Sequence, residues 1–198
     1  MEGSAAKGFG GRPPTGSFMF KLIPFNQVRS RHIRRFEAYW QAKRGDRAMP
    51  WRRDIDPAEL KPILPWMLVV EIEPEPFRVL YRLAGTKVVE MNGIELTGRY
   101  LDTLDDDGAN FTAQGIAAYR QAWTSGQPVY GCYRWPTPSG AEYLVEFAIY
   151  PVEEPGTDGQ CIALEDWEIE RKLSARDEPP LPYVRHPTRK GPPGKPDR

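Results

Sequence analysis

The sequence contains few of the side chains that most often hold metals and prosthetic groups. Its 198 residues include two cysteines, Cys132 and Cys161, and two histidines, His32 and His186. The cysteines show neither the short spacing of a zinc site nor the density of a disulfide-rich secreted domain. We therefore expect no metal site and a reduced interior.

A long uninterrupted apolar run is also missing. The longest one near the N-terminus, residues 17–25 (SFMFKLIPF), contains Lys21 and Pro24 and is too short to cross a bilayer. It also lacks the cleavage pattern of a signal peptide. The sequence therefore predicts no membrane insertion and a cytoplasmic location.

There is no excess of charge of either sign, because 27 basic residues balance 27 acidic ones. The charges are nevertheless segregated. Residues 29–53 carry nine Arg or Lys against two acids, whereas residues 142–170 carry nine acids and no Arg or Lys. A chain polarised in this way can dock onto itself, onto a second copy or onto a charged partner. Binding of an acidic partner or of nucleic acid through the basic segment is therefore an alternative function. Nucleic acid is not favoured, because no helix-turn-helix or zinc module is recognisable.

What the sequence does have is enough apolar material for a core, with 40% hydrophobic residues that include six Trp, nine Tyr and eight Phe. Residues 77–83 alternate with the period of two that is typical of a strand with one buried face. We expect the inward face to carry Phe77, Val79, Tyr81 and Leu83.

The order of the predicted elements defines a fold class. A hairpin of strands over residues 66–72 and 77–83 precedes helices over 86–91, which Thr86 can cap, and 109–125. Strands over 128–135, 142–151 and 161–165 follow. This order predicts an α+β fold in which a five-stranded antiparallel sheet has its helices inserted after the first hairpin.

An amphipathic helix is predicted before this sheet, over residues 27–43, with Asn26 as its cap. Its apolar stripe consists of Ile33, Phe36 and Trp40. The stripe can pack on its own domain or pair with a second copy. We expect a homodimer in which these three residues are the self-association surface.

Four segments follow from these patterns. We expect a mostly flexible tail over residues 1–25, a helical extension over 26–65, the sheet domain over 66–173 and a disordered, Pro-rich basic tail over 174–198.

The element order, together with YRLAGTKVVEMNGIELTGRYL at residues 81–101, resembles the PAS domain family, and more narrowly its bacterial single-domain type 5 group. The opening pattern of that group is also present, at Tyr39-Trp40, Pro50-Trp51-Arg52, residues 54–57 (DIDP) and Leu60. The resemblance covers about residues 35–167. It implies a PAS-like fold and a sensory or protein-interaction module, not an enzyme, that encloses a ligand-sized space.

The resemblance also allows PAS subtypes to be tested. The light-sensing flavin type carries a cysteine, and haem sensors carry an axial histidine, in the helical region that corresponds to residues 87–99. This region contains neither residue type. The cofactor is thus unknown, and haem, a covalent flavin and a metal are not expected. A small organic ligand stays open.

Six residues are candidates for the lining of a ligand pocket, because they point inward from a strand or face the sheet from a helix: Tyr81, Val88, Met91, Tyr119, Tyr133 and Phe147. Each can equally be ordinary core. Arg82 is a structural or recognition charge, which we expect to pair with Glu71 on the neighbouring strand or with Asp56.

These expectations combine into one functional hypothesis. The chain is a PAS-type sensory or protein-interaction module, homodimeric and possessing no output domain of its own, because the residues after Trp167 are too few for one. Its signal would then pass in trans to a signalling partner that is unknown. A small enzyme with the same fold is a third hypothesis, but no pair of residues in the sequence requires it.

Overall fold

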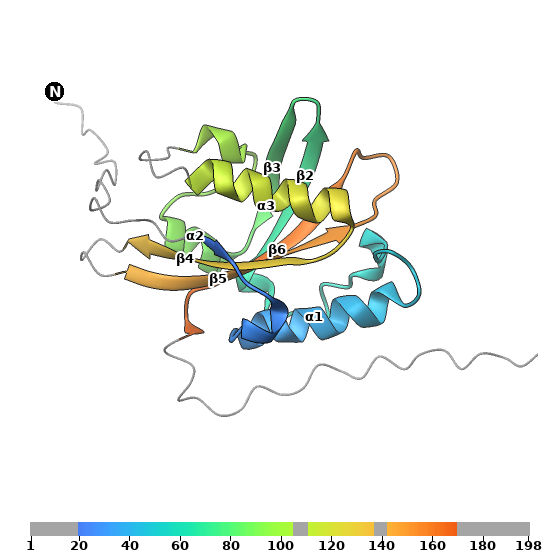
Figure 1. The fold of residues 1–198 in the computed structure, drawn as a ribbon, viewed down its shortest axis with the longest axis horizontal. Helices are drawn as coiled ribbons and strands as arrows, with labels where there is room; N and C mark the ends of the chain where they lie inside the picture. The colour runs from blue at the N-terminus through green and yellow to red at the C-terminus, as the bar shows by residue number, and fades with distance from the viewer. Residues whose placement is uncertain (1–19, 105–110, 137–141, 170–198) are drawn as a thin grey trace, which may run out of the picture.

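The computed structural model describes residues 20–104, 111–136 and 142–169. An antiparallel sheet of six strands, in the order β1-β4-β5-β6-β2-β3, forms its centre (Figure 1). The strands are β1 (Lys21–Leu22), β2 (Met67–Pro74), β3 (Phe77–Ala84), β4 (Val129–Pro136), β5 (Glu142–Val152) and β6 (Gln160–Asp166). The α-helices in the described ranges are α1 (Arg31–Arg44), α2 (Thr86–Asn92) and α3 (Phe111–Ser125). The predicted α+β fold with five antiparallel strands is confirmed.

The sixth strand, β1, comes from residues that the sequence assigns to a flexible tail. Lys21 pairs with Cys132 and Leu22 with Gly131 of β4, and the Ile23 amide donates to the Tyr130 carbonyl at 3.0 Å. Residues 20–25 therefore belong to the folded domain. The Pro-rich segment over residues 174–198 lies outside the described residues.

The hairpin of β2 and β3 shows where the predicted strand phase holds and where it fails. Phe77, Val79 and Tyr81 are buried, as the alternation predicts. Leu83 is 48% exposed, so its predicted inward orientation is wrong. The register shifts between Val69 and Val70, and such a bulge moves the following side chains to the opposite face.

The two faces of the sheet carry separate apolar clusters. Helix α3 covers one face, which we call the inner face, and α1 covers the other, the outer face (Figure 1). On β5 the alternation is complete: Phe147 and Ile149 belong to the inner cluster, whereas Ala148 and Tyr150 belong to the outer one. Side chains that are consecutive on β5 thus reach different helices.

Helix α1 begins at Arg31, four residues later than predicted, and Ser30 rather than Asn26 caps it. The Ser30 hydroxyl accepts from the Ile33 amide at 3.2 Å. The amides of Arg29 and Ser30 both donate to Glu146 on β5, at 2.8 Å each. These long-range bonds hold the residues before the helix in an extended conformation, which a local pattern cannot predict.

The apolar stripe of α1 lies in the core of its own chain. Ile33, Phe36 and Trp40 have no exposed surface. Phe36 packs edge-on against Tyr150, and the Trp40 indole donates to the Pro151 carbonyl at 3.0 Å. Pairing two copies through these three side chains would require α1 to leave its sheet, and the homodimer stays a prediction.

Gly85 joins β3 to α2 at a point where backbones meet. A Cβ atom there would lie 2.4 Å from the Pro65 carbonyl oxygen, so only glycine fits this close approach. Gly85 is also the N-cap of α2, without a side-chain bond, and the predicted cap Thr86 is the first helical residue instead.

Across the described ranges, no helix combines the length and the apolar character that crossing a membrane requires.

Candidate functional site

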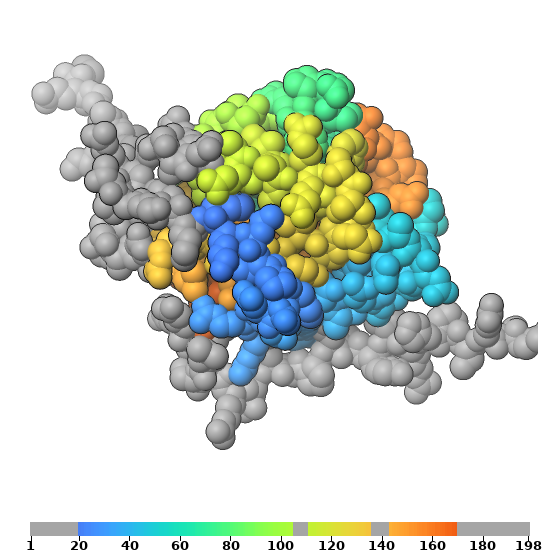
Figure 2. All heavy atoms as spheres, viewed as in Figure 1, coloured from blue at the N-terminus to red at the C-terminus, as the bar shows by residue number. Residues whose placement is uncertain are grey.

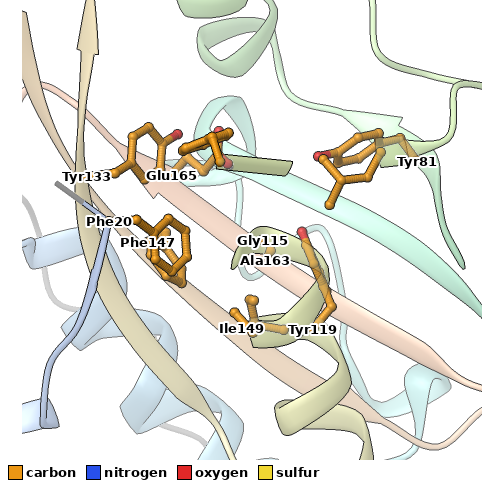
Figure 3. A pocket seen from close by; sticks show the side chains of 12 residues that line it. Phe20, Tyr81, Gly115, Tyr119, Tyr133, Phe147, Ile149, Ala163 and Glu165 are labelled. Carbon is orange, nitrogen blue, oxygen red and sulfur yellow. The ribbon is translucent and has the colours of Figure 1, made fainter. Parts of the chain in front are cut away.

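A small cavity lies between α3 and the inner face of the sheet (Figure 3). Its volume is about 30 Å³, which is room for one or two water molecules. Its lining comes from the N-terminal segment, β3, the short 3₁₀ helix Leu101–Thr103, α3 and the three C-terminal strands. It consists of Phe20, Tyr81, Leu101, Phe111, Gly115, Ala118, Tyr119, Tyr133, Phe147, Ile149, Ala163 and Glu165.

The polar groups of this cavity come from four different elements. Tyr81 lies on β3, Tyr119 on α3, Tyr133 on β4 and Glu165 on β6. In Figure 3 the hydroxyl oxygens of the three tyrosines point toward the same space as the Glu165 carboxyl group. The fold therefore brings together four polar groups in surroundings that are otherwise apolar.

Glu165 reaches the cavity because of the alternation along β6. Cys161 and Ala163 belong to the inner cluster, and Glu165 follows in the same phase. The protein surrounds its carboxyl group, and the side chain retains some accessible surface because it faces the cavity. This residue was missed by the sequence analysis, although extending the period of two from Cys161 would have found it.

Burial controls the ionisation of Glu165. Loss of water raises the pKa of its carboxyl group from an ordinary 4.5 to about 7, and a hydrogen bond from Tyr133 opposes the rise. Among the described residues that line the cavity, none is Lys, Arg or His. The carboxylate therefore has no positive partner in the cavity wall.

The tyrosine hydroxyls stay protonated over a wide pH range. Burial raises the pKa values of Tyr81, Tyr119 and Tyr133, and the nearby charge of Glu165 raises each of them further. A protonated hydroxyl can donate one hydrogen bond and accept others. The cavity thus offers donors and acceptors to a small guest.

Aromatic rings close the cavity on the side of the N-terminal segment. The Phe20 ring lies 5.0 Å from that of Phe147 and 5.9 Å from that of Phe111, measured between centroids. Figure 2 shows this segment, in blue, beside α3, in yellow. Phe147 reaches its place because Gly131 has no side chain: a Cβ atom there would lie 2.3 Å from the Phe147 ring. Phe20 was also missed, since β1 is too short to show a pattern.

Four of the six predicted pocket residues line the cavity, namely Tyr81, Tyr119, Tyr133 and Phe147. Val88 is fully buried in the inner cluster but does not line it. Met91 packs against the edge of that cluster, and its carbonyl accepts from the Trp135 indole at 3.3 Å. The two residues from α2 are therefore core neighbours of the cavity.

Arg82 lies away from the cavity. Its Nε atom is 3.4 Å from Glu71 on the neighbouring strand, one of the two partners expected from the sequence. The Arg82 side chain is 59% exposed, so this is a surface ion pair and contributes little to stability.

The outer face holds a second group of buried polar side chains, which surrounds the start of α1. The Ser30 hydroxyl donates to Asp166 at 2.7 Å, and the His32 Nδ1 atom lies 3.1 Å from the same carboxyl oxygen. Burial alone would raise the pKa of Asp166. The hydrogen bond and charge of His32, together with the hydrogen bond from Ser30, outweigh this effect, so the pKa of Asp166 is lowered. This group anchors the helix.

The basic segment is partly neutralised within the chain. Arg29 lies 3.2 Å from Glu146, Lys43 lies 2.8 Å from Glu59, and Arg47 lies 2.6 Å from Asp54. These contacts do not favour binding of nucleic acid or of an acidic partner. At Arg29, a residue of the basic segment pairs with the acidic segment of the same chain.

The part of the chain that the structure describes holds no group of three or more His, Cys, Asp or Glu placed to bind a metal. The cavity lining has a carboxyl group and three phenols, but no nucleophile paired with a base.

Comparison with known proteins identifies the family to which this chain belongs. The type 5 model of the family described as "PAS domain" matches residues 28–151, more than half of the chain. The chain belongs to the PAS domain family. The match begins before α1, so it includes the helix that the sequence analysis places in an extension. PAS domains are typically sensory modules.

None of the curated proteins compared with this chain matches it. Among solved structures, the chain is similar to one titled "Structure of an RNA-binding Light-Oxygen-Voltage Receptor", with 16% sequence identity and a TM-score of 0.43. The similarity covers 80% of this chain and 41% of that receptor chain, so this chain spans less than half of the receptor's length.

Proposed function

We propose that this chain is a cytoplasmic sensory PAS domain whose input is a small molecule held in the cavity and whose output is a contact with a separate partner protein. The observation that carries the proposal is the convergence of three tyrosine hydroxyls and the Glu165 carboxyl group on one cavity. Buried polar groups that point into a cavity in an apolar core are typical of ligand sites.

The sheet offers a route from the cavity to the surface. Strands β5 and β6 contribute cavity residues on one face, such as Phe147 and Ala163, and contact α1 with the other. The Tyr150 hydroxyl donates to the Ile33 carbonyl of α1 at 3.3 Å. A guest that displaces either strand would therefore change how α1 packs on the opposite face of that strand, one layer of side chains away.

Native mass spectrometry of freshly purified protein tests this function, because it reports the oligomeric state and any retained small molecule together. A guest small enough for this cavity binds too weakly to survive purification, so the spectra are recorded with small molecules added. We then expect a native mass above the mass of the denatured chain by that of one small guest per chain. Equal masses, together with no change in stability on addition of small molecules of any charge, would contradict the proposal.

A matched pair of variants ties the guest to the cavity. Gly115→Val places a branched side chain on the cavity side of α3, where a Cβ atom meets Leu101 at 3.4 Å. Ala117→Val puts the same residue on an exposed position of the same helix. We expect the retained mass to disappear in the first variant and to stay in the second.

A further inference from the structure

The cavity combines one carboxyl group with many aromatic rings. Six of its twelve lining residues are aromatic: Phe20, Tyr81, Phe111, Tyr119, Tyr133 and Phe147. A carboxylate in such surroundings is costly to ionise unless a positive charge comes close. The cavity wall supplies no such charge, as none of the described lining residues is basic.

We propose that the guest is a small protonated amine, whose ammonium group pairs with the Glu165 carboxylate and lies against the tyrosine rings. This inference rests on the proposed function, because it names the class of ligand for the same cavity. An ammonium ion is attracted both to a carboxylate and to the face of an aromatic ring, and both attractions grow when water is excluded.

The hydroxyl groups suit the same guest. An ammonium group carries up to three N–H donors, of which the carboxylate can accept one or two. The hydroxyl oxygens of Tyr81 and Tyr119 point into the same space and can accept the others. The hydrogen bond from Tyr133 meanwhile positions the Glu165 carboxyl group. All donors of the guest can thus be satisfied.

Other ligand classes fit less well. An anion would bring a second negative charge beside Glu165 in a site without a basic residue. A neutral molecule would leave the carboxylate without a counter-charge. The volume of about 30 Å³ further restricts the guest to a few heavy atoms, as in methylammonium or ethylammonium.

Three probes of the same number of heavy atoms and of different charge test the inference: ethylammonium, ethanol and formate. Ligands of so few atoms bind with Kd values of about 1 mM at best, so each is titrated to about 20 mM at constant ionic strength. Amide NMR shifts of the wild-type chain at pH 8 report binding. We expect ethylammonium alone to shift resonances of the cavity residues.

Two variants assign the charge that is recognised. Glu165→Gln keeps the shape of the side chain and removes its charge, and should weaken ethylammonium binding about tenfold or more. Glu153→Gln removes the same charge from an exposed position and should change nothing. If Glu165→Gln fails to fold, the comparison of the three probes on the wild-type chain still decides.

The pH dependence provides an independent readout. Binding should weaken below about pH 7, where Glu165 takes up a proton. The other titratable groups that face this region, Tyr81, Tyr119, Tyr133 and Cys161, have pKa values raised by burial and do not titrate there.

The outcomes separate this inference from the function on which it rests. If formate or ethanol shifts the cavity resonances as strongly as ethylammonium does, the amine is wrong and the sensory cavity stands. If no probe binds but native mass spectrometry shows another guest, the amine is likewise wrong and the sensory cavity likewise stands. If no probe binds and no guest is retained, both proposals are wrong.

Discussion

Glu165 and Asp166 are neighbours on β6, yet they lie on opposite faces of the sheet and in opposite surroundings. Asp166 faces α1, where it accepts from Ser30 at 2.7 Å and lies 3.1 Å from His32. Glu165 faces the cavity, where the nearby Tyr133 hydroxyl only opposes the rise in its pKa and no basic residue is present among the described lining residues. The pKa of Asp166 is accordingly lowered, whereas burial raises that of Glu165 to about 7.

The difference shows how a fold distinguishes a structural carboxylate from a binding one. Buried polar groups are normally satisfied by partners from their own chain, and Asp166 is. A buried ionisable group whose surroundings penalise its charge marks a candidate functional site. The two faces of the sheet therefore have different tasks: the outer face holds the chain together, and the inner face leaves one charge to be matched from outside.

The largest expected effect tests the structural task of the outer face. Phe36→Ala removes a ring with no exposed surface, and we expect it to lower the free energy of unfolding by about 3–5 kcal/mol. Urea unfolding measures this loss. The exposed substitution Ala38→Ser on the same helix should change the free energy by less than about 0.5 kcal/mol.

The same experiment separates the two roles of the α1 stripe. If Phe36 packs within its own chain, the loss is independent of protein concentration. A loss that shrinks on dilution would instead show that the stripe joins two copies, because dilution removes the stabilisation that a dimer gives to the wild-type chain.

A smaller effect, of the opposite sign, is expected for the inner face. The pKa of Glu165 is about 7 in the folded chain and 4.5 ordinarily, so stability is lost as the pH rises from 4.5 to about 7 and the loss is then complete. This cost is roughly 3 kcal/mol at pH 8 and absent below pH 4.5. Gln cannot ionise. The free energy of unfolding of Glu165→Gln, relative to that of the wild-type chain, should therefore rise by about this amount between pH 4 and pH 8.

Chemical unfolding at a series of pH values measures this gain. Glu153→Gln is the control, because its side chain is exposed, and its difference from the wild-type chain should not change with pH. A difference for Glu165→Gln that is equally independent of pH would show that the cavity does not penalise the charge.

Asp166→Asn should act in the reverse direction and by a somewhat smaller amount. At pH 7 it weakens bonds to a buried charge, and we expect a loss of about 2 kcal/mol. Because the folded pKa lies below the ordinary 3.8, this contribution is present above pH 3.8 and is lost as the pH falls further. The loss should therefore shrink toward pH 3 in the same unfolding series, and a loss that grows there would refute the pairing.

The smallest effect is expected at Arg82, which belongs to neither face. Its ion pair with Glu71 is exposed, and Arg82→Ala should lower the free energy of unfolding by less than about 1 kcal/mol. Thermal unfolding in low and high salt checks this, since any loss should diminish with salt. A larger loss would give Arg82 a structural role that its contacts do not show.

The sequence predicts the regular parts of this fold well. Alternation in β3 places Phe77, Val79 and Tyr81 correctly, because one buried face imposes a period of two. The prediction fails at Leu83, because β3 carries one extra residue, Arg82, between the partners of Val70 and Val69, and this bulge changes the phase of β3. It also fails at the start of α1, because the carboxylates that hold Ser30 are more than 100 residues distant in the chain.

Four of the six aromatic residues that line the candidate site were predictable from the sequence. Tyr81, Tyr119, Tyr133 and Phe147 follow from strand or helix phase, and all four line the cavity. Glu165 also follows from the period of two that begins at Cys161, but it was passed over because residues 142–170 carry nine acids and a single acid does not stand out among them. Phe20 has no local pattern at all.

The central claim is that the Glu165 carboxyl group lies without a counter-charge in the cavity, and its pKa tests this claim most directly. Carbon-13 NMR of the side-chain carboxyl groups, followed from pH 3 to pH 9, yields the values for Glu165 and Asp166 in one experiment. We predict a midpoint of about 7 for Glu165 and one below the ordinary 3.8 for Asp166. A Glu165 midpoint near its ordinary value of 4.5 would contradict the account.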